Sequence, residues 1–168
     1  KTQDLSTGGI MARITLPEGD APESHRLLSL QPEMGKAMAM LSEAVYQKSG
    51  LNVRVREAIR MRVALLNQCQ VCLRYRFPEL IEAGVDETFY DEIEQWREST
   101  VYSSGEKLAI EYAERFIGDH LAIDNDFFVV LKSVFSDVEI YEMTTAIAAL
   151  LANGRILQVL QVEQVCAI

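Results

Sequence analysis

Two cysteines, Cys69 and Cys72, lie three positions apart. On a helix, residues i and i+3 share a face, so the two sulfurs can meet. Asn67 and Gln68 indicate a short break before Cys69, which places this thiol near a helix N-terminus, where free N–H groups and the helix dipole stabilise a thiolate. Such settings lower a thiol pKa from about 8.5 to ~3.5–7.5, as a redox nucleophile needs. A disulfide that closes so small a loop has little structural value, so the spacing predicts reversible opening and closing.

A zinc site and a purely structural pair are the alternatives for these two cysteines. Zinc would need about two further ligands, and the candidates His25, His120 and Cys166 are not spaced like a second half-site. Free cysteines are also common core residues, so two buried thiols can fall at this spacing without a function. We expect no metal, and we expect no cofactor because a glycine-rich phosphate loop is missing.

The segment 56–72 resembles the carboxymuconolactone decarboxylase superfamily and, within it, the alkylhydroperoxidase AhpD-like branch. That branch carries a glutamate, eleven intervening residues, then Cys-x-x-Cys and a histidine four positions on. Glu57, Cys69 and Cys72 match in type and spacing. The resemblance extends over roughly residues 30–162.

The resemblance implies an AhpD-like helical bundle that assembles into trimers or hexamers. It also implies that a hydroperoxide is the substrate and that a dithiol or a protein disulfide partner is the reductant. In this scheme Cys72 attacks the peroxide and becomes a sulfenic acid, and Cys69 then closes the disulfide. The helix dipole instead favours Cys69 as the more acidic thiol; for peroxide attack we follow the family. Glu57 would be a general base that helps to deprotonate a thiol, whereas the pattern alone favours a surface glutamate paired with Arg60.

The histidine of the family's proton relay falls on Arg76. An arginine stays charged and cannot shuttle protons near neutral pH. It could stabilise a thiolate at Cys72, one helical turn away, or it could pair with Glu57. Tyr75 and His120 are the candidates to replace the relay. The predicted catalytic residues are Cys72, Cys69, Glu57 and Arg76.

Two other function classes stay open at this point. A decarboxylase or lactone-processing enzyme of the wider superfamily works without the thiol pair, so the Cys-x-x-Cys motif counts against it. A non-catalytic, redox-sensing oligomeric helical protein would follow from the loss of the relay at Arg76.

The composition fits one globular domain. The chain has 168 residues, of which 49% are hydrophobic and 24% charged, as in ordinary globular domains with a substantial core. Its formal net charge of −9 argues against binding to nucleic acid or to an anionic membrane. Apolar stretches of about 18 residues without charges are absent, so we expect no transmembrane helix. The start lacks a signal-peptide pattern, so we expect a cytoplasmic protein.

Helical periodicity runs through nearly the whole chain, which predicts a single all-α domain over residues 11–168. We expect residues 1–10 to lie outside it, as a disordered arm or a remnant of cloning, because Met11 resembles a natural start. The expected helices cover 32–47, 52–66, 69–83, 86–96, 103–117, a short segment after 124, and 137–161.

Several helix ends are marked by capping residues. Asn52 fits an N-cap, Gly84 fits a C-terminal stop, and the segments 103–106 and 136–139 fit capping boxes. The C-terminal helix is apolar on more than one face, so we expect it to lie partly in the core and partly in a subunit contact of a homo-oligomer. We expect methionines 34, 38 and 40 in the core and His25 in solvent.

Overall fold

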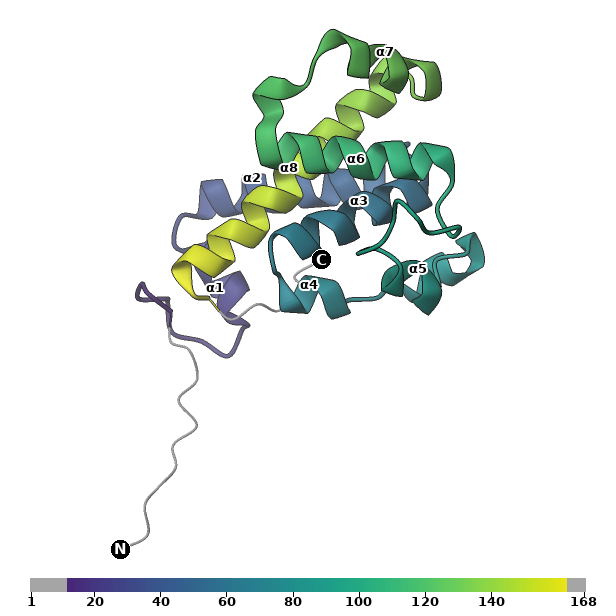
Figure 1. Ribbon diagram of the computed structural model, residues 1–168. Coiled ribbons are helices and arrows are strands. Elements are labelled where there is room, and N and C mark those ends of the chain that lie inside the picture. The colour runs from purple at the N-terminus through teal and green to yellow at the C-terminus, as the bar shows by residue number, and fades with distance from the viewer. Residues whose placement is uncertain (1–11, 163–168) are drawn as a thin grey trace, which may run out of the picture.

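The computed structural model describes residues 12–162, and this part of the chain is all-helical, as predicted (Figure 1). The expectations for residues 1–10 and for Cys166 lie outside the described residues. The α-helices are α1(Glu23–Ser29), α2(Pro32–Glu43), α3(Val53–Leu66), α4(Gln70–Arg74), α5(Glu87–Asp91), α6(Ser104–Asp119), α7(Asn125–Val134) and α8(Asp137–Leu160). A π-helical turn η1(Ala44–Lys48) and two 3-10 turns, η2(Pro78–Ala83) and η3(His120–Ala122), complete the order.

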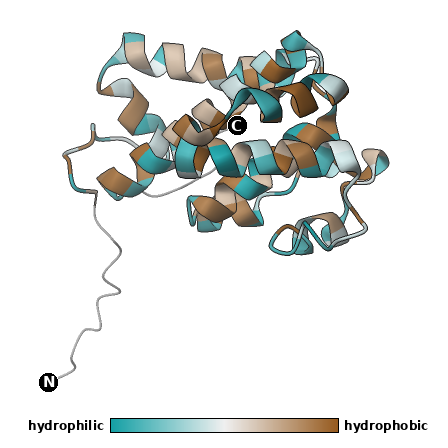
Figure 2. Ribbon diagram, turned by 45° about the horizontal axis from the view of Figure 1, so that its top comes forward, coloured by the Kyte–Doolittle hydropathy of each residue, from teal (hydrophilic) through white to brown (hydrophobic). Residues whose placement is uncertain are grey.

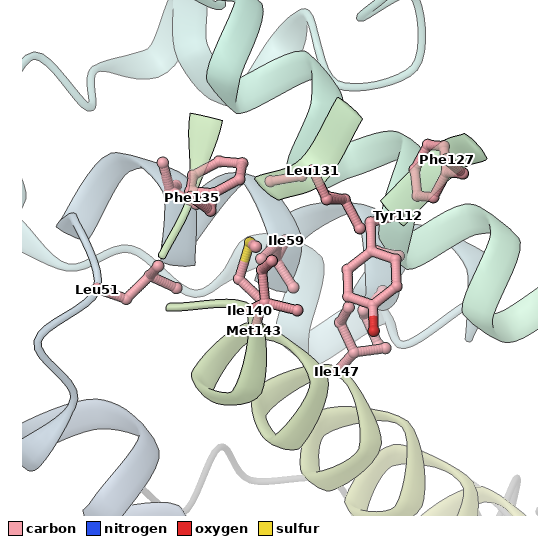
Figure 3. Close-up of a cluster of buried hydrophobic side chains, with 13 residues drawn as sticks. Leu51, Ile59, Tyr112, Phe127, Leu131, Phe135, Ile140, Met143 and Ile147 are labelled. Carbon is pink, nitrogen blue, oxygen red and sulfur yellow. The ribbon is translucent and has the colours of Figure 1, made fainter. Parts of the chain in front are cut away.

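The centre of the fold is formed by α3, α6 and α8, which pack on one another (Figure 1). Ile59 of α3 meets Met143 and Ile147 of α8, and all three side chains are fully buried. Tyr112 of α6 and Leu131 of α7 close the same cluster (Figure 3). Figure 2 shows hydrophobic and hydrophilic residues interspersed along the helices, as expected for amphipathic helices around a shared core.

Helix α8 is apolar on several sides, but only part of it is buried in the core. By length and composition it is the one helix in residues 12–162 that could cross a membrane. Its middle nevertheless carries Met143 and Ile147, which lie in the core, while Val138, Tyr141 and Val159 are exposed. One side of the helix therefore packs in the core, and apolar side chains on its other sides remain exposed.

The predicted caps are confirmed. The Asn52 side chain accepts a hydrogen bond from the Arg54 N–H, and both capping boxes form, at the starts of α6 and α8. Gly84 ends the η2 turn with a φ of 77°, in the left-handed region that favours glycine. These ends are predictable because a cap involves only neighbouring residues.

Two predicted helices are shorter than expected. The helix expected over 69–83 ends at Arg74 and is followed by an extended link and the η2 turn. The cause is Pro78: the residue before a proline avoids helical angles, and Phe77 has φ −104° and ψ 96°. The helix expected over 86–96 ends at Asp91 and continues as irregular turns, which bury Ile93 and Trp96 in a second cluster against α3 and α6.

Candidate functional site

Cys69 and Cys72 form a disulfide with an S–S distance of 2.06 Å. Cys69 is the N-cap of α4, and its Sγ accepts a hydrogen bond from the Cys72 N–H at 3.2 Å. The predicted meeting of the two sulfurs at the start of a helix is therefore confirmed. Cys69 is only 1% exposed, whereas Cys72 is half-buried, so Cys72 is the cysteine that a reactant reaches more easily.

A tight turn between α3 and α4 places the disulfide. Gln68 takes the left-handed conformation, with φ 55°, and turns the chain after α3. Helix α8 supports this turn, because the Gln158 side chain donates to the Asn67 carbonyl. Gly154 allows the close approach: a Cβ there would lie 2.7 Å from the Asn67 side-chain nitrogen.

Beneath the disulfide, Glu57 and Arg60 of α3 form a buried ion pair. Arg60 donates from Nε to one Glu57 oxygen at 2.7 Å and from Nη2 to the other at 2.6 Å. The two residues are 1% and 3% exposed. The pairing agrees with the pattern-based alternative, but its expected place on the surface is wrong. Burial disfavours the Arg60 charge, yet the hydrogen bonds and the charge of Glu57 outweigh it, so the pKa of Arg60 is raised.

Arg60 also contacts the segment that carries the cysteines. It donates from Nη1 to the Cys72 carbonyl at 2.7 Å and from Nη2 to the Tyr75 carbonyl at 3.1 Å. Its guanidinium lies 5.4 Å from the Phe77 ring centre. The sequence pattern predicts Arg60 only as a surface partner of Glu57, so these contacts are not predicted. An arginine and a glutamate one helical turn apart among apolar residues were the available signal.

Arg76 has other partners than either of the two predicted for it. It pairs with Glu87 at 2.9 Å, donates from Nη1 to the Leu73 carbonyl at 2.7 Å, and lies 3.9 Å from the Tyr90 ring centre. The predicted pair with Glu57 is wrong, because Glu57 is bound by Arg60. Since Arg76 sits in the extended link before Pro78, the helical i, i+4 relation to Cys72 is lost.

Tyr90 lies near both Arg76 and the Glu57 carboxylate. Burial and then the negative charge of Glu57 raise the pKa of Tyr90 to about 12, so this phenol stays protonated at neutral pH. Of the two candidates for a replacement relay, Tyr75 contributes its carbonyl to Arg60 and packs its ring against Phe77, and His120 is the C-cap of α6.

An apolar cavity of about 600 Å³ lies beside the disulfide, and both cysteines line it. Its other walls come from α1, α2, η1 and α8, with Met34, Met38 and Ile156 among the lining residues. The core placement expected for the methionines is wrong at Met34, which is 65% exposed, and at Met40, which is 58% exposed. His25 is exposed, as expected, but it also lines this cavity. Within residues 12–162, histidine, cysteine and carboxylate side chains form no cluster that could hold a metal ion.

Known proteins resemble this chain in sequence. The profile of the carboxymuconolactone decarboxylase family matches residues 32–115, a segment that includes Glu57 and both cysteines of the disulfide. Two uncharacterized proteins from Mycobacterium tuberculosis, of strains CDC 1551 / Oshkosh and H37Rv, are each 36% identical over 103 residues. This match covers 60% of the chain but 36% of each relative, so it spans about a third of their length.

Solved structures resemble the chain over nearly its whole length. A protein of unknown function from Agrobacterium tumefaciens, whose name associates it with the antioxidant defence protein AhpD, is 27% identical with a TM-score of 0.71, over 92% of this chain and 97% of that one. An uncharacterized peroxidase-related protein from Silicibacter sp. TM1040 has a TM-score of 0.78 over 98% and 96% of the two chains. At 14% identity, the second structure shows a shared fold alone.

Proposed function

We propose that this chain, which belongs to the AhpD-like branch of the carboxymuconolactone decarboxylase family, is a thiol-dependent oxidoreductase. Its proposed substrates are hydroperoxides, which it reduces. One observation carries the proposal: a disulfide joins the buried Cys69 to the more accessible Cys72 on the wall of an apolar cavity. A nucleophile that the substrate can reach and a resolving thiol held behind it are what a two-cysteine peroxide cycle requires.

The cycle has three steps. The Cys72 thiolate attacks the terminal peroxide oxygen; the S–O bond forms, the O–O bond breaks, and the leaving alkoxide takes a proton to become an alcohol. The Cys69 thiolate then attacks the sulfur of the Cys72 sulfenic acid; the S–S bond forms, the S–O bond breaks, and the leaving hydroxide takes a proton to become water. A dithiol finally supplies two electrons and two protons and returns both cysteines to thiols.

Water, and not a side chain, transfers the protons in this cycle. Glu57 is held by Arg60, and Arg76 is held by Glu87, so neither side chain serves as the relay that the family pattern predicts at these positions. Cys72 is half-buried and lines the cavity, so solvent reaches it. Water at Cys72 can protonate the leaving alkoxide.

The cavity favours a hydroperoxide with an apolar group over hydrogen peroxide. Its volume of about 600 Å³ lies within the usual range for small-molecule sites, ~300–1,000 Å³. Met34 and Met38 on its wall are flexible apolar side chains that adapt to ligands of different shape. We therefore expect cumene hydroperoxide to be turned over faster than hydrogen peroxide when dithiothreitol is the reductant.

Cysteine variants test the chemistry directly. Cys72→Ser should abolish peroxide consumption. Without added dithiol, Cys69→Ser should consume one equivalent of peroxide and hold a sulfenic acid at Cys72 that a dimedone probe traps, whereas the wild type closes its disulfide. Met38→Asp should raise the KM for cumene hydroperoxide, and Met40→Asp is the matched control, because Met40 lies on the same helix but does not line the cavity.

Other results would select another function. Disulfide cycling without peroxide turnover would favour the redox-sensing alternative. Activity on a lactone or carboxylate substrate that survives replacement of both cysteines would favour the decarboxylase alternative.

We also propose that the protein is a homo-oligomer, as the family resemblance implies. Apolar side chains on α7 and the first turns of α8 are exposed: Val130 at 49%, Val134 at 50%, Val138 at 67% and Tyr141 at 71%. Large contiguous apolar patches mark contact surfaces, and we propose that these four side chains belong to one. Sedimentation at micromolar concentration should show a trimer or hexamer, and a monomer alone would refute this proposal.

A further inference from the structure

Two arginines hold the C-terminal end of α4, the short helix that carries Cys72. The last carbonyls of any helix have no partner inside that helix. Arg60 donates to the carbonyls of Cys72 at 2.7 Å and Tyr75 at 3.1 Å, and Arg76 donates to that of Leu73 at 2.7 Å. The helix has only five residues, so these contacts replace the next turn that would normally stabilise it.

Arg60 is the more firmly fixed of the two. Its side chain is 3% exposed, whereas that of Arg76 is 31% exposed. Glu57 binds the guanidinium through two hydrogen bonds, which sets the plane of the fork and points its remaining donors at α4. A shift of Arg60 would leave buried charges and carbonyls unpaired, which is costly.

We propose that Arg60 is a positioning residue for the redox step. By holding the Cys72 and Tyr75 carbonyls, it keeps α4 wound when the disulfide is reduced, so that the Cys72 sulfur stays beside the Cys69 sulfur. Glu57 then serves to orient Arg60 and does not accept a proton. The inference rests on the proposed function only in that the cysteine pair cycles between dithiol and disulfide.

Positioning of this kind changes the reduction potential. Reduction by a dithiol adds two electrons and two protons to the cysteine pair and breaks the S–S bond. The disulfide requires both sulfurs within bonding distance, but the dithiol does not. When α4 is held, closing the disulfide costs little further ordering. When α4 is loosened, closure costs more, so the equilibrium moves toward the dithiol.

The test is the equilibrium of the Cys69–Cys72 pair with a glutathione buffer, read by mass spectrometry after alkylation. We expect the double variant Glu57→Gln, Arg60→Met to lower the equilibrium constant for the disulfide about tenfold, a potential ~30 mV more positive. Removing both charges avoids a lone buried ion. Arg60→Lys keeps the charge but loses the fork, so its potential should shift in the same direction.

The pair formed by Arg54 and Glu106 is the matched control. Arg54 binds Glu106 at 2.6 Å and donates to the Val101 carbonyl at 3.0 Å, on a segment without cysteines. The double variant Arg54→Met, Glu106→Gln should lower the melting temperature. Its equilibrium constant for the Cys69–Cys72 disulfide should stay within twofold of the wild-type value.

The outcomes are separable. An unchanged or more negative potential in the Arg60 variants, or an equal shift in the control, overturns the inference. If the double variant does not fold, the reduction potential of Arg60→Lys is the test: a more positive value supports the inference, and an unchanged or more negative value overturns it. Because the assay contains no peroxide, a protein with the expected shift but without peroxide turnover would refute the proposed function and leave the role of Arg60 standing.

Discussion

Replacement of Arg76 by alanine distinguishes a structural role from a role at the thiolate. The family resemblance predicts a relay histidine at the position of Arg76, but the contacts of Arg76 are an ion pair with Glu87, a hydrogen bond to the Leu73 carbonyl and a stacking contact with Tyr90. Its charge is balanced by Glu87 at 2.9 Å. The geometry therefore predicts that Arg76→Ala lowers stability and leaves the reactivity of Cys72 nearly unchanged.

The size of the stability loss follows from the three contacts. The Glu87 side chain is 70% exposed, so the ion pair contributes only ~0.2–1 kcal/mol. The contact with Tyr90 contributes ~0.5–1 kcal/mol, and the hydrogen bond to the Leu73 carbonyl about 1 kcal/mol, since Arg76 is partly hydrated. The free energy of unfolding should fall by roughly 2 kcal/mol, which corresponds to about 4–8 °C in melting temperature for a chain of this size.

Thermal melts and a pH profile of iodoacetamide reactivity of the reduced protein measure the two effects. Glu87→Ala is the control, because it removes the partner and leaves the Arg76 charge in place. A rise of about one unit in the Cys72 pKa in Arg76→Ala, equal to ~1.4 kcal/mol, with an unchanged melting temperature would refute the reasoning. It would show that Arg76 acts on the thiolate through its charge.

Three further predictions concern stability. Glu57→Gln should lower the free energy of unfolding by ~3–5 kcal/mol, because it leaves the buried Arg60 charge unpaired; a loss below about 1 kcal/mol in a denaturant titration would contradict this. Burial raises the pKa of Glu106, but hydrogen bonds from Arg54 and Ser103 outweigh it, so the pKa lies below its ordinary 4.5. The carboxylate thus adds stability at neutral pH that is lost as the pH falls below 4.5, and Glu106→Gln should flatten this part of the melting-temperature profile. Met143→Ala, at a fully buried site, should cost ~2–5 kcal/mol, as checked by urea unfolding.

Local sequence signals predicted most of the fold. The caps at Asn52 and Ser136 and the stop at Gly84 depend on residues within one turn, so the pattern places them correctly. Where tertiary contacts compete, the pattern fails. The turns after α5 bury Trp96, which donates to Glu114 on α6 at 3.0 Å, and helical periodicity contains no information about that partner.

The candidate site divides in the same way. The sequence by itself determined that Cys69 and Cys72 can meet, because their spacing and the break before them are local properties of the chain. Only the tertiary structure decided which charged side chains contact the segment that carries the two cysteines. Arg60 binds the Cys72 carbonyl because the turn after α3 folds α4 back toward that helix, and Arg76 faces Glu87 because Pro78 ends the helical register. Both pairings join residues eleven or more positions apart, beyond the one-turn range over which a helical pattern predicts contacts.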